Sequence, residues 1–206
     1  MTTPRGVIEA PRSTRLVLVG QAPGRSSGPA RPIMGPSGRR LAELAGLGFP
    51  GEYEAWFERL NLLPEYPGKG SSQSDAFVLA RARLAAWELF PALVGRRGVL
   101  LGRGVADAFR LGGSGRDGRR ALFEWRFVCR REVRCRASGD LLRRTLDSWP
   151  AREPAPSWAA RERFLAAMVP HPSGVSHWWD EREHREAAER FLRGVVAATR
   201  LATTRR

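Results

Sequence analysis

The chain has 206 residues, 42% of them hydrophobic, and is therefore long enough to bury a full hydrophobic core. Its formal net charge of +14 at pH 7 indicates a polyanionic partner, for which nucleic acid is favoured over a membrane surface. Lys69 is the only lysine, so an arginine-rich genome is an alternative source of the charge. That alternative explains arginine in place of lysine, but it leaves the shortage of Asp and Glu unexplained.

Composition also excludes several classes of protein. No apolar run reaches the length of a membrane span, and the first residues, MTTPRGVIEAPRST, lack the apolar core of a signal peptide. We therefore expect a cytoplasmic protein of bacterial or phage type that associates with the nucleoid and has no membrane partner. The two cysteines, Cys129 and Cys135, are too few for a tetrahedral zinc site or an iron–sulfur cluster, so we expect free thiols, no metal and no other cofactor.

The N-terminal half alternates predicted strands and helices. A continuous apolar run, RLVLVG at 15–20, predicts a buried parallel strand that ends at a glycine. A loop rich in Gly and Pro follows, and Ser37 is the predicted cap of a helix with leucine and alanine at helical spacing. WFERLNLL at 56–63 predicts a second strand, with ambiguous periodicity, and a helix is expected over about 76–93.

The C-terminal half continues the alternation. RGVLLG at 97–102 predicts a third strand, followed by a short helix in RGVADAFRL and an edge strand or hairpin in FEWRFVCRREVRC. DLLRRTLDSW is expected to be a helix and PAREPAPS an exposed turn or linker. RERFLAAMVP leads into the last strand, and a long amphipathic helix is predicted over 180–200, acidic in its first turn as the helix dipole favours.

Strands that alternate with helices predict a parallel sheet covered on both faces. We therefore expect an α/β fold, a three-layer αβα sandwich around a central, mainly parallel four-stranded sheet. The whole chain, 1–206, is expected to form one monomeric domain with flexible tails at 1–13 and 201–206.

Three polar loops follow predicted strands, and ligands of such sheets bind beyond the carboxyl ends of the strands. GQAPG follows the first strand, Asn61 and PEYPGKG follow the second, and HPSG follows the last. In GQAPG, Gly20 and Gly24 allow close approach of the backbone and Pro23 stiffens the turn, although a purely structural turn is an equally good interpretation. The loops are expected to converge on one site.

Two of these loops carry side chains suited to recognition. The carboxamide of Asn61 can read the edge of a base by paired hydrogen bonds, although an isolated asparagine more often satisfies the local backbone. His171 lies in a Pro-His-Pro-Ser turn, where Pro172 restricts the direction of the imidazole. The hydroxyl of Ser173 and the amide of Gly174 can bind a phosphate oxygen.

In their residues, order and separation, GQAPG, Asn61 and HPSG resemble the uracil-DNA glycosylase superfamily. The resemblance spans nearly the whole chain, because PIMGPSGRRLAEL and GVLLGRGVADAF are similar to that superfamily's first helix region and third strand with its helix. It implies a monofunctional, metal-independent DNA glycosylase of base excision repair, which flips a base out of the DNA and hydrolyses its N-glycosidic bond.

The resemblance also implies residue roles. Gln21 would lie beside the water site, Asn61 would read the N3–H and O4 edge of the base, and His171 would stabilise the charge developing on O2. Base contacts are thereby assigned to Gly20, Gln21, Ala22, Ile33 and Asn61. DNA contacts are assigned to Pro23, Gly24, Lys69, Ser173, Gly174, Val175, His177 and Trp178, with Val175 as a wedge in the base stack and Trp179 also along the opened duplex. Trp178 and Trp179 have core positions as the alternative.

The chain departs from the superfamily at several positions. The first loop has Gln21 and Ala22, with no carboxylate to position water, and Ile33 falls where the superfamily stacks a phenylalanine on the base. Lys69 and Asp75 are candidates for compensation. The departures favour a 5-substituted or deaminated base over plain uracil. They also leave open a weak or inactive base- or DNA-binding module of the same fold, or an RNA-directed relative.

Overall fold

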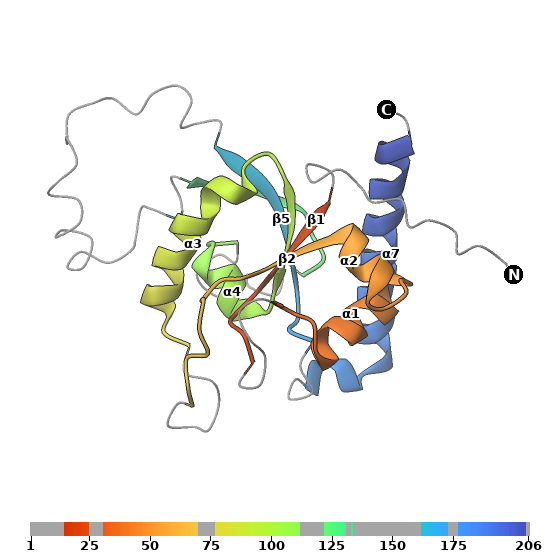
Figure 1. The fold of residues 1–206 in the computed structure, drawn as a ribbon, viewed down its shortest axis with the longest axis horizontal. Helices are drawn as coiled ribbons and strands as arrows, with labels where there is room; N and C mark the ends of the chain where they lie inside the picture. Colours follow the sequence, from red (N-terminus) through yellow and green to blue (C-terminus); the bar gives the residue numbers. More distant parts are fainter. Residues whose placement is uncertain are drawn as a thin grey trace, which may run out of the picture.

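The computed structural model describes residues 15–24, 31–69, 77–111, 122–130, 133, 162–172 and 177–204. Its centre is a five-stranded sheet in the order β2-β1-β3-β5-β4 (Figure 1). The strands are β1 (Leu16–Gly20), β2 (Phe57–Asn61), β3 (Arg97–Leu101), β4 (Arg126–Cys129) and β5 (Arg163–Val169). The predicted helix in DLLRRTLDSW, the predicted linker after it and the predicted tail at 1–13 lie outside the described residues.

The central strands of the sheet are parallel, as the alternation of elements predicts. β1 pairs with β2 on one side and with β3 on the other, and β3 pairs with β5, all in parallel. β4 joins β5 as an antiparallel edge strand. The α/β class with a mainly parallel sheet is therefore confirmed, but the predicted number of four strands is wrong, because the edge segment pairs along β5 and adds a fifth.

Helices cover both faces of this sheet (Figure 1). They are α1 (Pro36–Ala45), α2 (Gly51–Trp56), α3 (Leu79–Leu93), α4 (Arg103–Ala108) and α7 (Arg182–Thr204), with a 3-10 turn, η2 (His177–Asp180), before the last. α3 and α4 lie on one side of the sheet in Figure 1, and α1, α2 and α7 lie on the other. None of the helices in the described part of the chain combines the length and the hydropathy that a membrane span needs.

β1 shows how the sequence builds the two cores. All five of its residues are buried, because both faces of the strand are covered. Val17 and Val19 pack in the cluster that contains the α3 and α4 residues, whereas Leu16 and Leu18 pack with residues of α1 and α7. Alternate side chains of a strand point to opposite faces, so one apolar run contributes to two hydrophobic cores.

Three predicted boundaries need correction. Ser37 is not the cap of α1: the helix begins at Pro36 after Gly35, without a side-chain cap, because proline is pre-organised for the first helical position. The predicted second strand loses Trp56 to the unpredicted helix α2, and β2 ends at Asn61. α7 continues to Thr204, so residues 201–204 are helical where a flexible tail was expected.

Gly38, in the first turn of α1, packs closely against the preceding turn at Ile33. A Cβ on Gly38 would clash with the backbone oxygen of Ile33, whereas a Cβ on Gly194 in α7 would meet nothing within 4 Å. We expect Gly38→Ala to lower the free energy of unfolding by about 1–3 kcal/mol or more, since the contact is with backbone. Gly194→Ala is the matched control and should raise it by about 0.5–1 kcal/mol. Urea unfolding measures both, and equal effects of the two variants would contradict the close packing.

Candidate functional site

The topology of the sheet marks one edge as the place for a ligand. β1 lies between β2 and β3, so the chain leaves β1 to build one half of the sheet and later returns to build the other. The loops that follow β1 and β3 therefore diverge at this point, and open α/β sheets bind ligands outside the carboxyl ends of such strands. The candidate site is the carboxyl edge formed by the ends of β1, β2, β3 and β5.

Gly20, Asn61 and Ile33 meet at the end of β1. Gly20 is in register with Asn61, and the backbone of Leu62 donates a hydrogen bond of 2.8 Å to the oxygen of Gly20. A Cβ on Gly20 would lie 3.0 Å from Asn61 Oδ1 and 3.1 Å from Ile33 Cγ1. The absence of that Cβ is what lets both side chains lie over the end of β1. Three of the residues predicted to contact the base are thus brought together.

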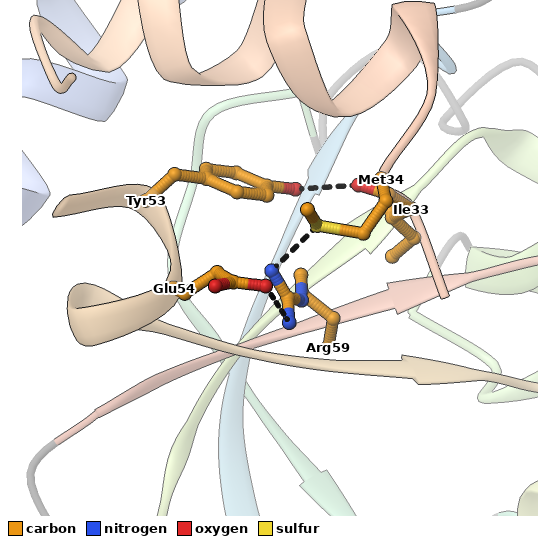
Figure 2. Close-up of polar contacts among 5 residues, drawn as sticks. All are labelled: Ile33, Met34, Tyr53, Glu54 and Arg59. Carbon is orange, nitrogen blue, oxygen red and sulfur yellow. Dashed lines mark hydrogen bonds and ion pairs between the residues drawn. The ribbon is translucent and has the colours of Figure 1, made fainter. Parts of the chain in front are cut away.

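Ile33 has a backbone conformation that its side chain disfavours. Its φ is 55°, in the left-handed region, where a β-branched residue is an outlier. Residues held in such conformations cluster at functional sites, where the surrounding structure over-determines them. The Tyr53 hydroxyl donates a hydrogen bond of 3.1 Å to the backbone oxygen of Ile33 and thereby holds this turn in place (Figure 2).

Arg59 on β2 completes the support of the same turn. Its guanidinium donates to Met34 Sδ at 2.8 Å and to Glu54 Oε1 at 3.2 Å (Figure 2). It also lies 5.4 Å from the centre of the Tyr53 ring, a cation–π contact. Ile33 is thereby held through its own carbonyl and through the neighbouring methionine, while its side chain lies on Gly20.

Tyr53 is fully buried and its hydroxyl has to stay protonated to donate to Ile33. Burial raises the pKa of Tyr53 well above its ordinary value of 10.0, and the nearby Arg59 guanidinium lowers it by less. The phenol is therefore neutral over the whole physiological range, and the hydrogen bond to the turn persists throughout it.

His171 lies at the other half of the same edge. The Gly102 amide donates a hydrogen bond of 2.7 Å to the oxygen of Val169, which joins the end of β3 to the end of β5. Gly102 has a φ of 91°, and a Cβ on it would lie 3.1 Å from the Cβ of His171. Only glycine suits this position, because both its backbone angle and its contact with His171 exclude a side chain.

These contacts place Asn61 and His171 at the same edge of the sheet. β2 and β5, which carry them, are separated in the sheet by β1 and β3. The Asn61 side chain lies over the end of β1, and the start of the His171 side chain lies against the end of β3. β1 and β3 are neighbours, about 4.8 Å apart, so Asn61 and the Cβ of His171 lie at the ends of adjacent strands.

The loop directly after β1 carries four more of the predicted site residues. Gln21 and Ala22 are half-buried, Pro23 is buried and Gly24 is exposed, all directly after β1. Lys69 is exposed beyond β2. Ser173, Gly174, Val175 and Asp75 lie outside the described residues, as does the side chain of His177, so their predicted roles stay predictions.

The two tryptophans after the last loop have different environments. Trp179 is only 3% exposed and belongs to the core on the α1 and α7 face, so the expectation that it lies along the DNA is wrong. Its indole N–H donates a hydrogen bond of 2.8 Å to the backbone oxygen of His171. Trp178 is half-buried, and its ring contacts Phe123, Trp179 and His184.

Sequence reasoning missed the residues that support the site from behind. Tyr53 contacts Ile33 through a backbone oxygen, Gly38 packs next to that same oxygen, and no local pattern indicates either feature. For Trp179, which the sequence analysis did name, the hydrogen bond to the His171 oxygen was not predicted. Gly102 did offer a signal, since RGVLLG ends on glycine as RLVLVG does. A strand-ending glycine marks a place where another backbone or side chain approaches closely.

Among the described residues, no group of three or more His, Cys, Asp or Glu side chains is placed to hold a metal ion. The described residues at this edge include a carboxamide, Asn61, and an imidazole, His171. A scan against protein-family models and a search of curated proteins both return no match for this chain.

Tyr53 makes the free energy of unfolding depend on pH in the alkaline range. Its pKa is raised in the folded chain, so its contribution to stability is complete below the ordinary pKa of 10.0 and is lost as the pH rises above it. We expect the free energy of unfolding to fall by up to about 1.4 kcal/mol per pH unit above that value. Tyr53→Phe should remove this component. Urea unfolding between about pH 8 and pH 11 measures it, and identical slopes in both proteins would contradict the assignment.

Proposed function

We propose that this protein is a monofunctional, metal-independent DNA glycosylase that excises a uracil-like or modified base, as its resemblance to the uracil-DNA glycosylase superfamily implies. The observation that carries the proposal is the placement of Asn61 and His171 over the adjacent ends of β1 and β3. A flipped base needs an edge reader on one side and a stabiliser of its departing charge on the other. A uracil-DNA glycosylase-like sandwich is the finer fold that this arrangement supports.

Asn61 and Ile33 are proposed to hold the base. A carboxamide offers one acceptor and two donors, which suits the paired N3–H and O4 groups of a pyrimidine. Ile33 gives an apolar surface without a ring, so it packs on a base less tightly than an aromatic side chain does. The fixed turn that carries Ile33 supports selection of the base by shape, because its position is set by Tyr53 and Arg59.

His171 is proposed to stabilise the leaving base. As the glycosidic C–N bond breaks, its electron pair moves into the base, where negative charge develops on O2, and the sugar becomes oxocarbenium-like. The imidazole stabilises that charge, water adds to C1′ of the sugar, and one proton of the water ends on the base. Gln21 can orient this water but cannot accept its proton, so the reaction depends on the departure of the base more than on activation of water.

The charge of the chain supports DNA as the substrate. A net charge of +14 favours binding of a phosphate backbone, with affinity that falls steeply as salt rises. The predicted phosphate contacts of Lys69 and Ser173 would add to this general attraction by fixing the strand beside the flipped nucleotide.

Single-turnover incubation with oligonucleotides tests the activity. Duplex and single-stranded DNA would each carry one uracil, 5-hydroxymethyluracil, hypoxanthine or xanthine, and alkali would then cleave abasic sites. We expect one of these bases to be excised, and His171→Ala to slow the reaction by about 10²- to 10³-fold, as for loss of a group that stabilises an oxyanion. DNA affinity at fixed salt should stay within a few-fold.

If neither the wild-type protein nor His171→Ala releases any base while both bind DNA tightly, the proposed glycosylase activity is contradicted. That result would favour a binding module of the same fold. Competition by RNA at stated salt separates the third possibility. RNA that displaces the DNA completely would favour an RNA-directed relative.

The variant Gly20→Ala tests whether the contacts of Asn61 and Ile33 with the end of β1 are needed for base release. The added Cβ would press on both side chains at about 3 Å and displace them from the end of β1. We expect the rate of base release to fall at least tenfold, since small misplacements of positioning groups have large effects on rate. Gly51→Ala, where a Cβ meets nothing within 4 Å, is the control. Equal rates in the two variants would contradict the contact's role.

A further inference from the structure

The backbone of His171 is held from a segment of the chain that follows the site loop. Trp179, in the 3-10 turn η2, donates from its indole nitrogen to the His171 oxygen at 2.8 Å. Trp179 is buried and His171 is half-buried, so this hydrogen bond is only partly exposed to water. Residues 171 and 179 are thereby brought together, and both ends of the loop between them are fixed.

His184 holds the same turn from the first part of α7. Its ring is stacked on the ring of Trp178, with centres 4.3 Å apart and an angle of 3° between planes. Its Nδ1 lies 2.9 Å from the backbone oxygen of Trp178, so Nδ1 carries the proton and donates. Its Nε2 lies 3.3 Å from Glu181 Oε2. The turn is thus joined to α7 by ring contact and by a hydrogen bond.

The two tryptophans link these contacts. Trp178 and Trp179 pack edge to face, with ring centres 4.8 Å apart at 81°. His184, Trp178 and Trp179 therefore form a continuous set of ring contacts. We call this set, Trp178, Trp179 and His184, the Trp–His brace.

We propose that the Trp–His brace positions His171 for the reaction, with Trp179 and His184 as positioning residues. The inference rests on the proposed function, because it assigns the brace a role in base release. Gly102 limits His171 from the side of β3, and Trp179 fixes its carbonyl from the side of η2. With both restraints in place, the imidazole starts from a fixed backbone. Without the second, the residue can rotate away from the developing charge.

A purely structural role for Trp179 makes a different prediction, and Trp179→Phe separates the two. Phenylalanine keeps an aromatic ring in the core but removes the N–H donor to His171. A structural role predicts altered stability with an unchanged site. The brace predicts a changed site in the folded protein, at temperatures far below unfolding.

The test uses the full chain and two readouts. The chain has only three histidines, so the imidazole signals of His171 can be assigned by NMR on 15N-histidine-labelled protein without DNA. We expect Trp179→Phe to shift the His171 ring signals and to slow single-turnover base release by about tenfold or more, with DNA affinity within twofold. Trp56→Phe in α2, whose ring contacts Arg200, is the matched control and should change neither.

His184 gives a second variant that does not touch the core tryptophan. His184→Ala should reproduce both effects, whereas His184→Asn keeps a donor near the place of Nδ1 and should restore part of the rate. Unchanged His171 signals in both Trp179→Phe and His184→Ala would overturn the brace. The NMR readout needs no turnover, so an inactive wild-type chain would refute the proposed glycosylase while the signals still decide whether the brace positions His171.

Discussion

The arrangement of the candidate site depends on the absence of two Cβ atoms. Gly20 and Gly102 end neighbouring parallel strands, and each is in contact with a residue from the next strand outward: Asn61 for Gly20 and His171 for Gly102. A methyl group at either position would press on that residue at about 3 Å. The space above the sheet edge is therefore set by close packing on glycine, a constraint that acts through sterics and is independent of pH and salt.

The rest of the described structure keeps these close contacts in place. On the β1 side, a neutral buried phenol and an arginine hold the strained turn at Ile33, and Gly38 lets α1 begin directly against it. On the β5 side, a tryptophan donor fixes the backbone that carries the imidazole. Tyr53 and Trp179 belong to the same hydrophobic core as residues of α1 and α7, so one core contributes to both halves of the edge.

Sequence patterns predicted the central part of this fold because the signal is local there. RLVLVG and RGVLLG contain continuous apolar runs, which are typical of strands covered on both faces, and the polar loops after the first, second and last strands indicated the candidate edge. The sequence did not predict helix α2, because six residues are too few to show a helical period. Its buried Tyr53 donates a hydrogen bond to Ile33, twenty residues earlier in the chain, and local patterns do not predict such a contact. For the adjacent tryptophans, the sequence left both DNA contact and core positions open. Trp179 is the buried one, and its hydrogen bond to the His171 oxygen joins residues that no local pattern connects.

The two strand-ending glycines also bear on how such a protein diverges. The positions that fix the geometry are backbone and glycine, where nearly every substitution is harmful, whereas Gln21, Ala22 and Ile33 present side chains that can be exchanged one at a time. In a protein of the proposed function, exchange of these three side chains would change the base that is recognised while the glycine contacts at the ends of β1 and β3 stayed as they are. Recognition of the base and construction of the sheet edge would then change independently of each other.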